Sequence, residues 1–309
     1  MGVFPFSEDN KRYHTLCYHN KRVYGCRVYK ASIDAGFTCP NIDGTRGRGG
    51  CVFCDGGSGY FTEDSALSVS EQLSREAERI RRKDPNAKIL AYFQAHSNTY
   101  APVERLAELY GEAVEWGAAA ISVATRADCI DEEKARLLGS LPVPVTVELG
   151  LQTADNASAQ RMNRCHSFEE FVEGYRLLKN HGLRVCVHII DGLPGESAED
   201  MLNTARILGK LHPDGVKIHL LHVIKGTALH RMYERGEYRP LERDEYIDIV
   251  VRQLELLPAQ TVIERVTGDG DKTKLIAPLW SADKISVLGG IDKRQRELDT
   301  WQGKLFSED

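Results

Sequence analysis

Three cysteines, Cys39, Cys51 and Cys54, lie close together in the glycine-rich stretch 39–54. No fourth cysteine or histidine follows them at metal-ligand spacing. A closed structural zinc site takes four protein ligands, so a set of three leaves one coordination position open for chemistry. Soft thiolates suit a [4Fe–4S] cluster, whose fourth iron would then be free to bind another molecule. Structural zinc, with His14 or His19 as the fourth ligand, is the alternative that these residue types leave open.

The elements that would position these cysteines alternate between strand-like and helix-like segments. Short apolar and β-branched runs predict strands at residues 31–38, 89–93, 118–124, 143–151, 183–190 and 216–223. Capping boxes and other start and stop signals predict helices near residues 68–83, 102–117, 131–139, 167–182 and 197–210. After residue 241 we expect one further helix, a strand at residues 260–266 and an irregular tail.

Strands that alternate with helices form a parallel sheet with right-handed crossovers. The expected strands look apolar on both faces, which is typical of a sheet covered by helices. We therefore predict an α/β protein with an incomplete (β/α)6 barrel, and a doubly wound open sheet is the other topology left open. In either fold the active site lies at the carboxyl ends of the strands. The predicted division is a basic helical segment (1–30), the partial barrel (31–240) and a C-terminal extension that closes the barrel (241–309).

The composition limits the kinds of protein that this chain can be. The chain has 309 residues, a net charge of −5 and 28% charged residues, which is ordinary for a globular protein and unlike a nonspecific nucleic-acid binder. It shows no long apolar span and no signal peptide, so we expect a cytoplasmic protein with no membrane contact. Eight unevenly spaced cysteines in such a chain favour metal binding or reactive thiols over disulfides. Cysteines without a partner at ligand spacing are expected to be packed thiols, namely Cys17, Cys26, Cys165 and Cys186.

The segment from Asp34 to Thr45, followed by Gly49 to Cys54, resembles the radical S-adenosylmethionine (SAM) superfamily, and specifically its YhcC/YtqA-like branch. The wide gap between the first two cysteines is similar to that in the catalytic subunit of Elongator, a tRNA wobble-uridine enzyme. Three more segments look like that relative, at residues 125–128, 148–152 and 192–196. Ala127 stands where the resemblance leads us to expect proline.

The resemblance implies the cofactors. Cys39, Cys51 and Cys54 would hold three irons of a [4Fe–4S] cluster, and the amino and carboxylate groups of SAM would bind the fourth. One electron from the reduced cluster would then cleave SAM to a 5′-deoxyadenosyl radical, so the chemistry is that of the cofactor and the protein positions it. A flavodoxin- or ferredoxin-type electron donor is the expected partner in this step.

Four side chains are implied as SAM contacts by the same resemblance. Phe53, between the last two cysteines, is expected near the adenine. Gln94 follows the second strand, where relatives hold the amino group of SAM. Gln152 and Arg164 resemble the fourth-strand glutamine and the following arginine that contact SAM in related barrels, although Arg164 could also be a helix-surface charge.

Four further residues could have either a functional role or a purely structural one. His188 lies where relatives place a ribose or carboxylate contact, and it could instead be a satisfied core histidine. Gly192 and Gly195 would let the backbone approach SAM closely, or they could simply form a tight turn. Cys129 follows the third strand at its catalytic end, so it is a candidate for a role near the substrate and otherwise a packed thiol.

The function implied by the resemblance is tRNA modification, at the side chain of a wobble uridine. Phosphate contacts are expected from Lys21, Arg22 and Arg27 and from Lys272 and Lys274. A radical SAM enzyme acting on a small metabolite and a non-enzymatic zinc-binding module are the two alternatives. The sequence leaves open which substrate atom is attacked and whether SAM is consumed or regenerated.

Overall fold

The computed structural model describes residues 4–56, 62–94, 96–268 and 270–308. Its main feature is a seven-stranded sheet in the order β1-β2-β3-β4-β5-β6-β8, in which every neighbouring pair is parallel. The strands are β1 (Val28–Ile33), β2 (Lys88–Phe93), β3 (Ala120–Thr125), β4 (Val145–Gln152), β5 (Arg184–Asp191), β6 (Gly215–Leu220) and β8 (Val262–Arg265). A strand order that follows the chain order is that of a barrel, so the doubly wound alternative is wrong.

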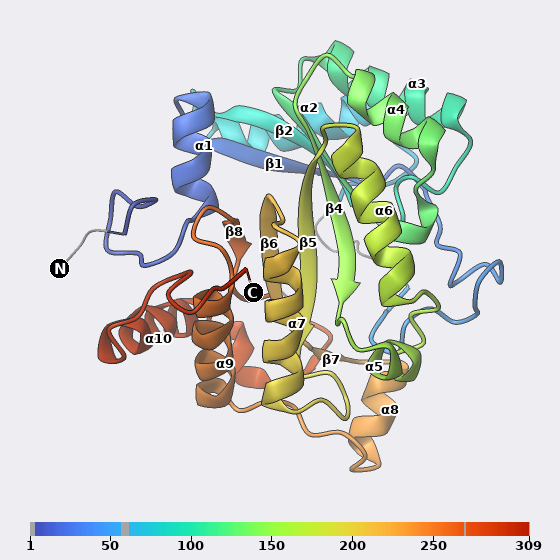
Figure 1. The fold of residues 1–309 in the computed structure, drawn as a ribbon. Helices are drawn as coiled ribbons and strands as arrows, with labels where there is room; N and C mark the ends of the chain where they lie inside the picture. The colour runs from blue at the N-terminus through green and yellow to red at the C-terminus, as the bar shows by residue number, and fades with distance from the viewer. Residues whose placement is uncertain (1–3, 57–61, 95, 269, 309) are drawn as a thin grey trace.

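Helices connect successive strands and cover the outer face of the sheet (Figure 1). They are α1 (Leu16–Tyr24), α2 (Val69–Arg81), α3 (Val103–Trp116), α4 (Glu132–Ser140), α5 (Asn156–Arg161), α6 (Phe168–Asn180), α7 (Ala198–Lys210), α8 (Ala228–Glu234), α9 (Arg243–Leu256) and α10 (Lys284–Glu297). Ser68 and Ser167 form the predicted capping boxes of α2 and α6. A two-stranded sheet pairs β7 (Val223–Ile224) with β9 (Leu275–Ala277).

The barrel is incomplete, as predicted, because no pairing joins β1 to β8 within the described residues. A bridge from Thr15 to Ile263 instead places α1 beside β8. Inside the barrel, Lys30 Nζ on β1 lies 3.3 Å from Glu264 Oε2 on β8. An ion pair and a helix therefore span the seam that strand hydrogen bonds would close in a full barrel.

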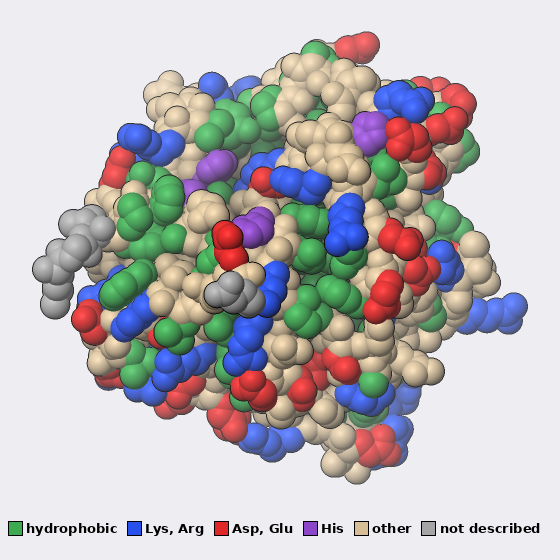
Figure 2. Space-filling view, in the orientation of Figure 1, with side chains coloured by type: hydrophobic (Ala, Val, Ile, Leu, Met, Phe, Trp, Pro, Cys, Tyr) green, Lys and Arg blue, Asp and Glu red, His purple; other side chains and the backbone are tan. Residues whose placement is uncertain are grey.

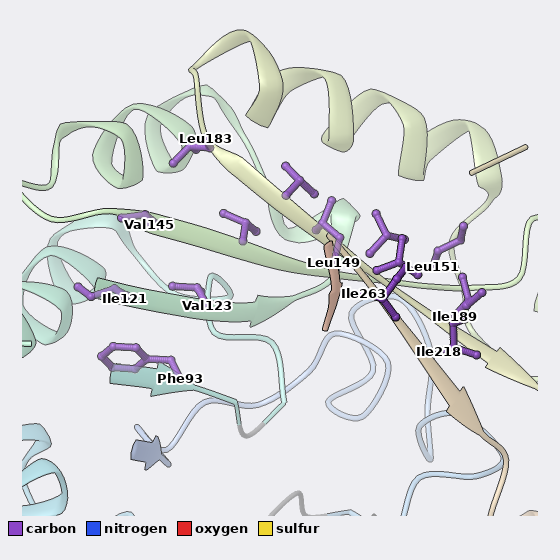
Figure 3. Packing of buried hydrophobic residues seen from close by; sticks show 14 of the residues in the cluster. Phe93, Ile121, Val123, Val145, Leu149, Leu151, Leu183, Ile189, Ile218 and Ile263 are labelled. Atoms are coloured by element: carbon purple, nitrogen blue, oxygen red, sulfur yellow. The ribbon is translucent and has the colours of Figure 1, made fainter. Parts of the chain in front are cut away.

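The two faces of the sheet differ in polarity. Outward-facing residues such as Ile121, Leu149 and Ile218 are fully buried and pack against the helices (Figure 3). Inward-facing residues include charged groups such as Glu148 and Lys217. The expectation of strands that are apolar on both faces is therefore wrong, because the interior of this barrel is lined by paired polar groups.

The first strand begins and ends earlier than the run at residues 31–38 suggested. β1 stops at Ile33, and the chain turns at Asp34, whose carboxylate accepts the backbone N–H of Gly36 at 2.9 Å. Gly36 adopts a φ of 73°, a conformation that an extended strand does not contain. The residues before the first cysteine thus form a loop, which carries Cys39 away from the strand axis.

Asp191 ends β5 and is buried beneath the outer helices. Gln253 of α9 donates from Nε2 to Asp191 Oδ1 at 2.6 Å, whereas no described residue forms a hydrogen bond with the buried Asp191 Oδ2. Burial raises the pKa of this carboxyl from 3.8 to about 7. The structure therefore holds a carboxyl group that is half protonated near neutral pH.

We expect Asp191→Asn to stabilise the protein at pH 8 by up to about 4 kcal/mol more than at pH 4, since three pH units correspond to about that free energy. The folded pKa lies above the unfolded one. The unfolded chain therefore loses this proton first as pH rises, and stability falls between about pH 4 and pH 7. Asparagine keeps the acceptor for Gln253 and carries no charge. Urea unfolding of both proteins across this range tests the prediction, and parallel pH profiles would contradict it.

No helix within the described residues is long and apolar enough to cross a bilayer.

Candidate active site

The three cysteines lie on one loop at the carboxyl end of β1. A turn closes at Cys39, whose carbonyl accepts the backbone N–H of Ile42 at 2.8 Å. The loop then returns to its start, because Gly50 N–H donates to Asn41 O at 2.8 Å. Gly49 and Gly50 have φ values of 78° and 73°, which glycine adopts at little cost and which reverse the chain just before Cys51.

A second segment holds this cysteine loop in place. Asn163, which follows α5, donates from Nδ2 to Gly50 O at 2.8 Å and to Arg48 O at 3.2 Å. In the other direction, the Asn41 side chain donates to Asn163 O. Val52 N–H also donates to Met162 O at 3.1 Å. The loop is therefore clamped on both sides to the segment after α5.

The thiols sit in a partly buried environment beside a cation. Burial raises the pKa of Cys51 to about 11, and burial likewise raises that of Cys54. The Arg126 guanidinium acts in the opposite direction on Cys51. Arg126 is itself anchored, since it donates to both carboxylate oxygens of Asp128 at 2.8 and 2.7 Å. Buried thiols of this kind ionise when a metal binds them, and the nearby cation stabilises the resulting negative charge.

The donor set fits an iron–sulfur cluster. Across the part of the chain that the structure describes, no three Cys, His, Asp or Glu side chains converge on a point that a single ion could occupy. A cubane presents a different iron to each thiolate, so its ligands need not converge in that way. Three thiols with an adjacent guanidinium and amide are thus suitable for a cluster.

His14 and His19 cannot complete a zinc site with these cysteines. His14 Nδ1 contacts Gln260 O at 2.9 Å, and both histidines line a cavity of about 410 Å³ with Arg184 and Val262. Arg184 and Val262 are the first residues of β5 and β8, so this cavity lies at the amino ends of the strands. The zinc module with a histidine ligand is therefore wrong, because the cysteines lie at the opposite end of the barrel.

Two of the expected SAM contacts, Gln94 and Gln152, follow strands at the cysteine end. Gln94 comes directly after β2, and its buried Nε2 has no hydrogen-bond partner among the residues that the structure describes. Gln152 ends β4 at a register shift and has a φ of 62°. Its side chain folds back so that any Cβ on Gly150 would overlap it. Polar groups held without a protein partner are available for a ligand, which fits the expected role of Gln94.

Arg164 is a structural anchor rather than a helix-surface charge. Its side chain is buried, and its guanidinium donates to the carbonyls of Leu151, Thr153 and His166. Burial lowers the pKa of Arg164 to about 10, so the group stays protonated at neutral pH. Arg164 therefore fixes the turn that follows β4, which carries Gln152, and a direct contact with SAM stays a prediction.

His188 belongs to a buried polar network centred on Glu148. His188 Nε2 lies 2.8 Å from Glu148 Oε2, so the interpretation as a satisfied core histidine is confirmed, and a contact with SAM stays a prediction. Further donors to the Glu148 carboxylate come from four strands and are Lys30, Tyr92, Ser122 and Lys217. Glu264 on β8 pairs in turn with Lys30 and Arg184. The inner wall of the barrel is therefore a continuous network of ions and hydrogen bonds.

The network stays ionised although it is buried. Burial alone favours the neutral form of Glu148, but Lys217, Lys30 and the His188 hydrogen bond outweigh it and hold the pKa of this carboxyl well below its usual value. Burial also acts against protonation of Lys217, and Glu148 overcomes it, so the pKa of Lys217 is raised. Sequence reasoning missed this role of Lys30 and Lys217, and the signal was a single charged residue inside each of the otherwise uncharged strands β1, β4 and β6.

Gly192 and Gly195 form a turn after β5. Their φ values are 87° and 80°, and Glu196 N–H donates to Leu193 O at 3.0 Å. The Gly192 carbonyl accepts a hydrogen bond from Tyr238 Oη at 2.8 Å. The tight-turn interpretation is confirmed, and close approach of SAM to this turn stays a prediction.

Phe53 is partly shielded from solvent, and Cys129 is fully buried. Phe53 is partly buried and packs against a small apolar cluster that contains Leu193 and Leu229. Cys129 is buried, and burial raises the pKa of its thiol to about 12. A neutral, buried thiol favours a packing role for Cys129, and its contact with substrate stays a prediction. Cys17 is exposed, so the packed-thiol interpretation is wrong for that residue.

Comparison with known families identifies the class of protein. Residues 42–208 match the family described as the radical SAM superfamily, and residues 213–297 match the radical SAM C-terminal domain. The first match spans more than half of the chain, which therefore belongs to the radical SAM superfamily. The cofactors of this superfamily are a [4Fe–4S] cluster and SAM, and the chain is a radical SAM enzyme.

The relatives agree with the resemblance seen in the motifs. YtqA of Bacillus subtilis (strain 168) is 42% identical over 307 residues, which are 98% of this chain and 95% of YtqA. YhcC of Escherichia coli (strain K12) is 34% identical over 89% of this chain and 90% of its own length. The tRNA uridine(34) acetyltransferase of Methanocaldococcus jannaschii is 31% identical over 173 residues, which are 55% of this chain and 32% of that protein.

Among solved structures, the archaeal Methanocaldococcus infernus Elp3 with an N-terminal deletion superimposes with a TM-score of 0.69. The match covers 89% of this chain and 64% of that one, at 21% identity. This match supports the fold of the partial barrel and of the C-terminal part of the chain. At 21% identity it is evidence for the fold alone.

Proposed function

We propose that this radical SAM enzyme holds its cluster on Cys39, Cys51 and Cys54 and modifies a wobble uridine in tRNA. When bound, the reduced cluster supplies one electron that cleaves SAM to methionine and a 5′-deoxyadenosyl radical. The observation that carries the proposal is the position of the cysteine loop at the carboxyl ends of the strands, beside a polar barrel interior. The proposal also includes a cytoplasmic location and a flavodoxin- or ferredoxin-type protein as the reductant of the cluster.

The contacts with SAM are proposed from where each residue lies. Gln94, whose buried Nε2 has no hydrogen-bond partner within the described part of the chain, is the best placed to meet the polar end of SAM. Gln152 would act beside it from the end of β4. Phe53 would pack near the adenine, and the turn at Gly192 would bring backbone close to the ribose. Arg164 would act through the carbonyls that it holds.

The nature of the barrel wall supports a polar substrate. Lys30 and Lys217 face two carboxylates, Glu148 and Glu264, so the inner wall is charged and polar. Ser122 and Tyr92 add hydroxyl groups. Such a wall suits a hydrogen-bonding base with a polar or anionic side chain better than an apolar molecule. Similarity to a tRNA uridine(34) acetyltransferase over 173 residues makes uridine in tRNA the preferred substrate.

The basic residues expected to contact RNA lie at opposite ends of the barrel. Lys274 Nζ lies 3.3 Å from Asp55, the residue after Cys54, and Lys272 is exposed nearby in sequence. Lys21 and Arg22 are on α1, which Figure 1 places at the upper left, while α5 and α8 lie at the bottom. On the face drawn in Figure 2, basic and acidic side chains are interspersed. The cysteine end is therefore the better candidate for holding an anticodon loop.

We expect Lys272→Glu and Lys274→Glu to weaken tRNA binding and to leave SAM cleavage without substrate unchanged. Each lost phosphate contact should reduce the slope of log affinity against log salt by about 0.7–0.9. The matched control is Lys21→Glu with Arg22→Glu at the other end of the barrel, which should bind tRNA like the parent. Fluorescence titrations with tRNA at several salt concentrations measure this. Equal weakening by the control pair would show that charge, and not position, decides binding.

Nucleoside profiling of tRNA from a strain that lacks the gene tests the substrate itself. The expected result is a changed set of modified wobble uridines, restored by the wild-type gene and not by a variant without the three cysteines. An unchanged set, in a strain with no redundant pathway, would favour the alternative of a small-metabolite substrate. The bound cofactors would be the same in both cases, so this experiment isolates the substrate.

A further inference from the structure

Asn41, which lies between the first two cysteines, is a buried side chain that faces one of the proposed cluster ligands. It is fully buried, and its Nδ2 lies 3.6 Å from Cys51 Sγ, within reach of an N–H···S hydrogen bond. The same Nδ2 donates to Asn163 O. An amide nitrogen has two hydrogens, so one group can serve both acceptors.

The orientation of this amide follows from its surroundings. Exchanging Nδ2 and Oδ1 would point an acceptor at the Asn163 carbonyl and at the sulfur. The other atom, Oδ1, is buried with no hydrogen-bond partner in the described parts of the chain, and it lies against Gly47, where any Cβ would overlap it. A glycine at position 47 therefore makes room for the amide, and the donor must face the sulfur.

The segment 163–165, whose first carbonyl accepts the Asn41 amide, is held in an unusual backbone conformation. Asn163 and Cys165 have φ values of 53° and 61°, which non-glycine residues rarely adopt. Arg164 between them is anchored by its buried guanidinium, and its carbonyl accepts Arg126 Nη1 at 2.8 Å. Backbone strain that the surroundings maintain is common at functional sites. Here it keeps the Asn163 carbonyl where it fixes the Asn41 amide.

We propose that Asn41 is a positioning residue that sets the reduction potential of the cluster by donating a hydrogen bond to the Cys51 thiolate. The inference rests on the proposed ligand set. Reduction adds one negative charge to the cluster and its thiolates, and a donor to sulfur stabilises that charge. Hydrogen bonds to the sulfurs are among the factors that set such potentials. The amide would therefore make the cluster easier to reduce by the electron donor.

Asn41→Leu removes the donor with little change in volume, and we expect the midpoint potential of its cluster to shift to a lower value. Gly47→Ala should shift the potential in the same direction, because its methyl would displace the amide. Asn86→Leu is the matched control. It makes the same substitution at an exposed asparagine just before β2, at the opposite end of the barrel from the cysteines, so its potential should match that of the parent. Anaerobic redox titrations followed by electron paramagnetic resonance measure all four proteins.

A second measurement uses the unchanged protein and does not depend on how well a variant loads. With asparagine labelled with ¹⁵N only in its side chain, the reduced cluster should show a ¹⁵N hyperfine coupling. No such coupling in the wild type, or an Asn41→Leu potential equal to that of the parent, would overturn the proposal. Failure of the proposed function would look different, because wild-type protein would then bind no cluster on these cysteines.

Discussion

Replacing Cys39, Cys51 and Cys54 together by serine is expected to abolish the cluster and, with it, the cleavage of SAM. The three thiols lie on one clamped loop, and a serine hydroxyl is a poor substitute for a soft thiolate ligand. Wild-type protein reconstituted without oxygen should hold about four irons and four sulfides, as a single cubane does. Iron and sulfide analysis with visible absorption measures this, and the triple variant should show only background.

The control for this experiment is the double variant Cys17→Ser with Cys26→Ser. Both thiols are in the N-terminal segment, on or just after α1, at the end of the barrel that bears His14 and His19. This variant should load and cleave SAM like the parent. A triple variant that still holds a full cluster would refute the ligand assignment. Equal iron loss in the control would show that the assay detects unfolding instead.

Glu148→Gln is expected to destabilise the protein by about 3–5 kcal/mol, the usual cost of leaving a buried charge without its partner. Lys217 is almost fully buried. Among the described residues, it forms its ion pair with Glu148. Lys30 keeps Glu264, so Lys217 bears most of the effect. Urea unfolding gives the free energy, read from the midpoint at constant slope.

Two further variants interpret the Glu148 result. Glu78→Gln breaks an exposed pair with Arg82 and should cost less than about 1 kcal/mol. Adding Lys217→Met to Glu148→Gln removes the unpaired charge and should recover part of the loss. If the double variant is no more stable than Glu148→Gln, the unpaired lysine is not the cause.

The same network predicts how stability changes in acid. The pKa of Glu148 is held well below its usual value, mainly by Lys217 and Lys30 against the effect of burial. Its contribution is therefore complete above the unfolded pKa, near pH 4.5, and is lost as pH falls through the folded value. Asp191 behaves in the opposite way, because its raised pKa removes stability as pH rises towards 7.

Local signals were enough to predict most helices and the class of fold. Ser68 and Ser167 mark helix starts through contacts with residues three positions on, and such contacts depend on neighbouring sequence alone. The same holds for the cysteine loop, where ligand type and spacing are visible in the chain. The strand β1 ends earlier than predicted because the turn at Asp34 and Gly36 interrupts an alternation of apolar with polar or small residues that continues to Thr38.

The sequence by itself thus determined the α/β alternation, the cofactor class and the three proposed ligands, since each rests on residues close together in the chain. Only the tertiary structure decided which polar groups meet. Glu148 gathers Lys30, Tyr92, His188 and Lys217 from four other strands, and Asn41 finds Asn163 across 122 positions of sequence. Strand register and barrel curvature set those contacts, and neither can be read from the periodicity of a single strand.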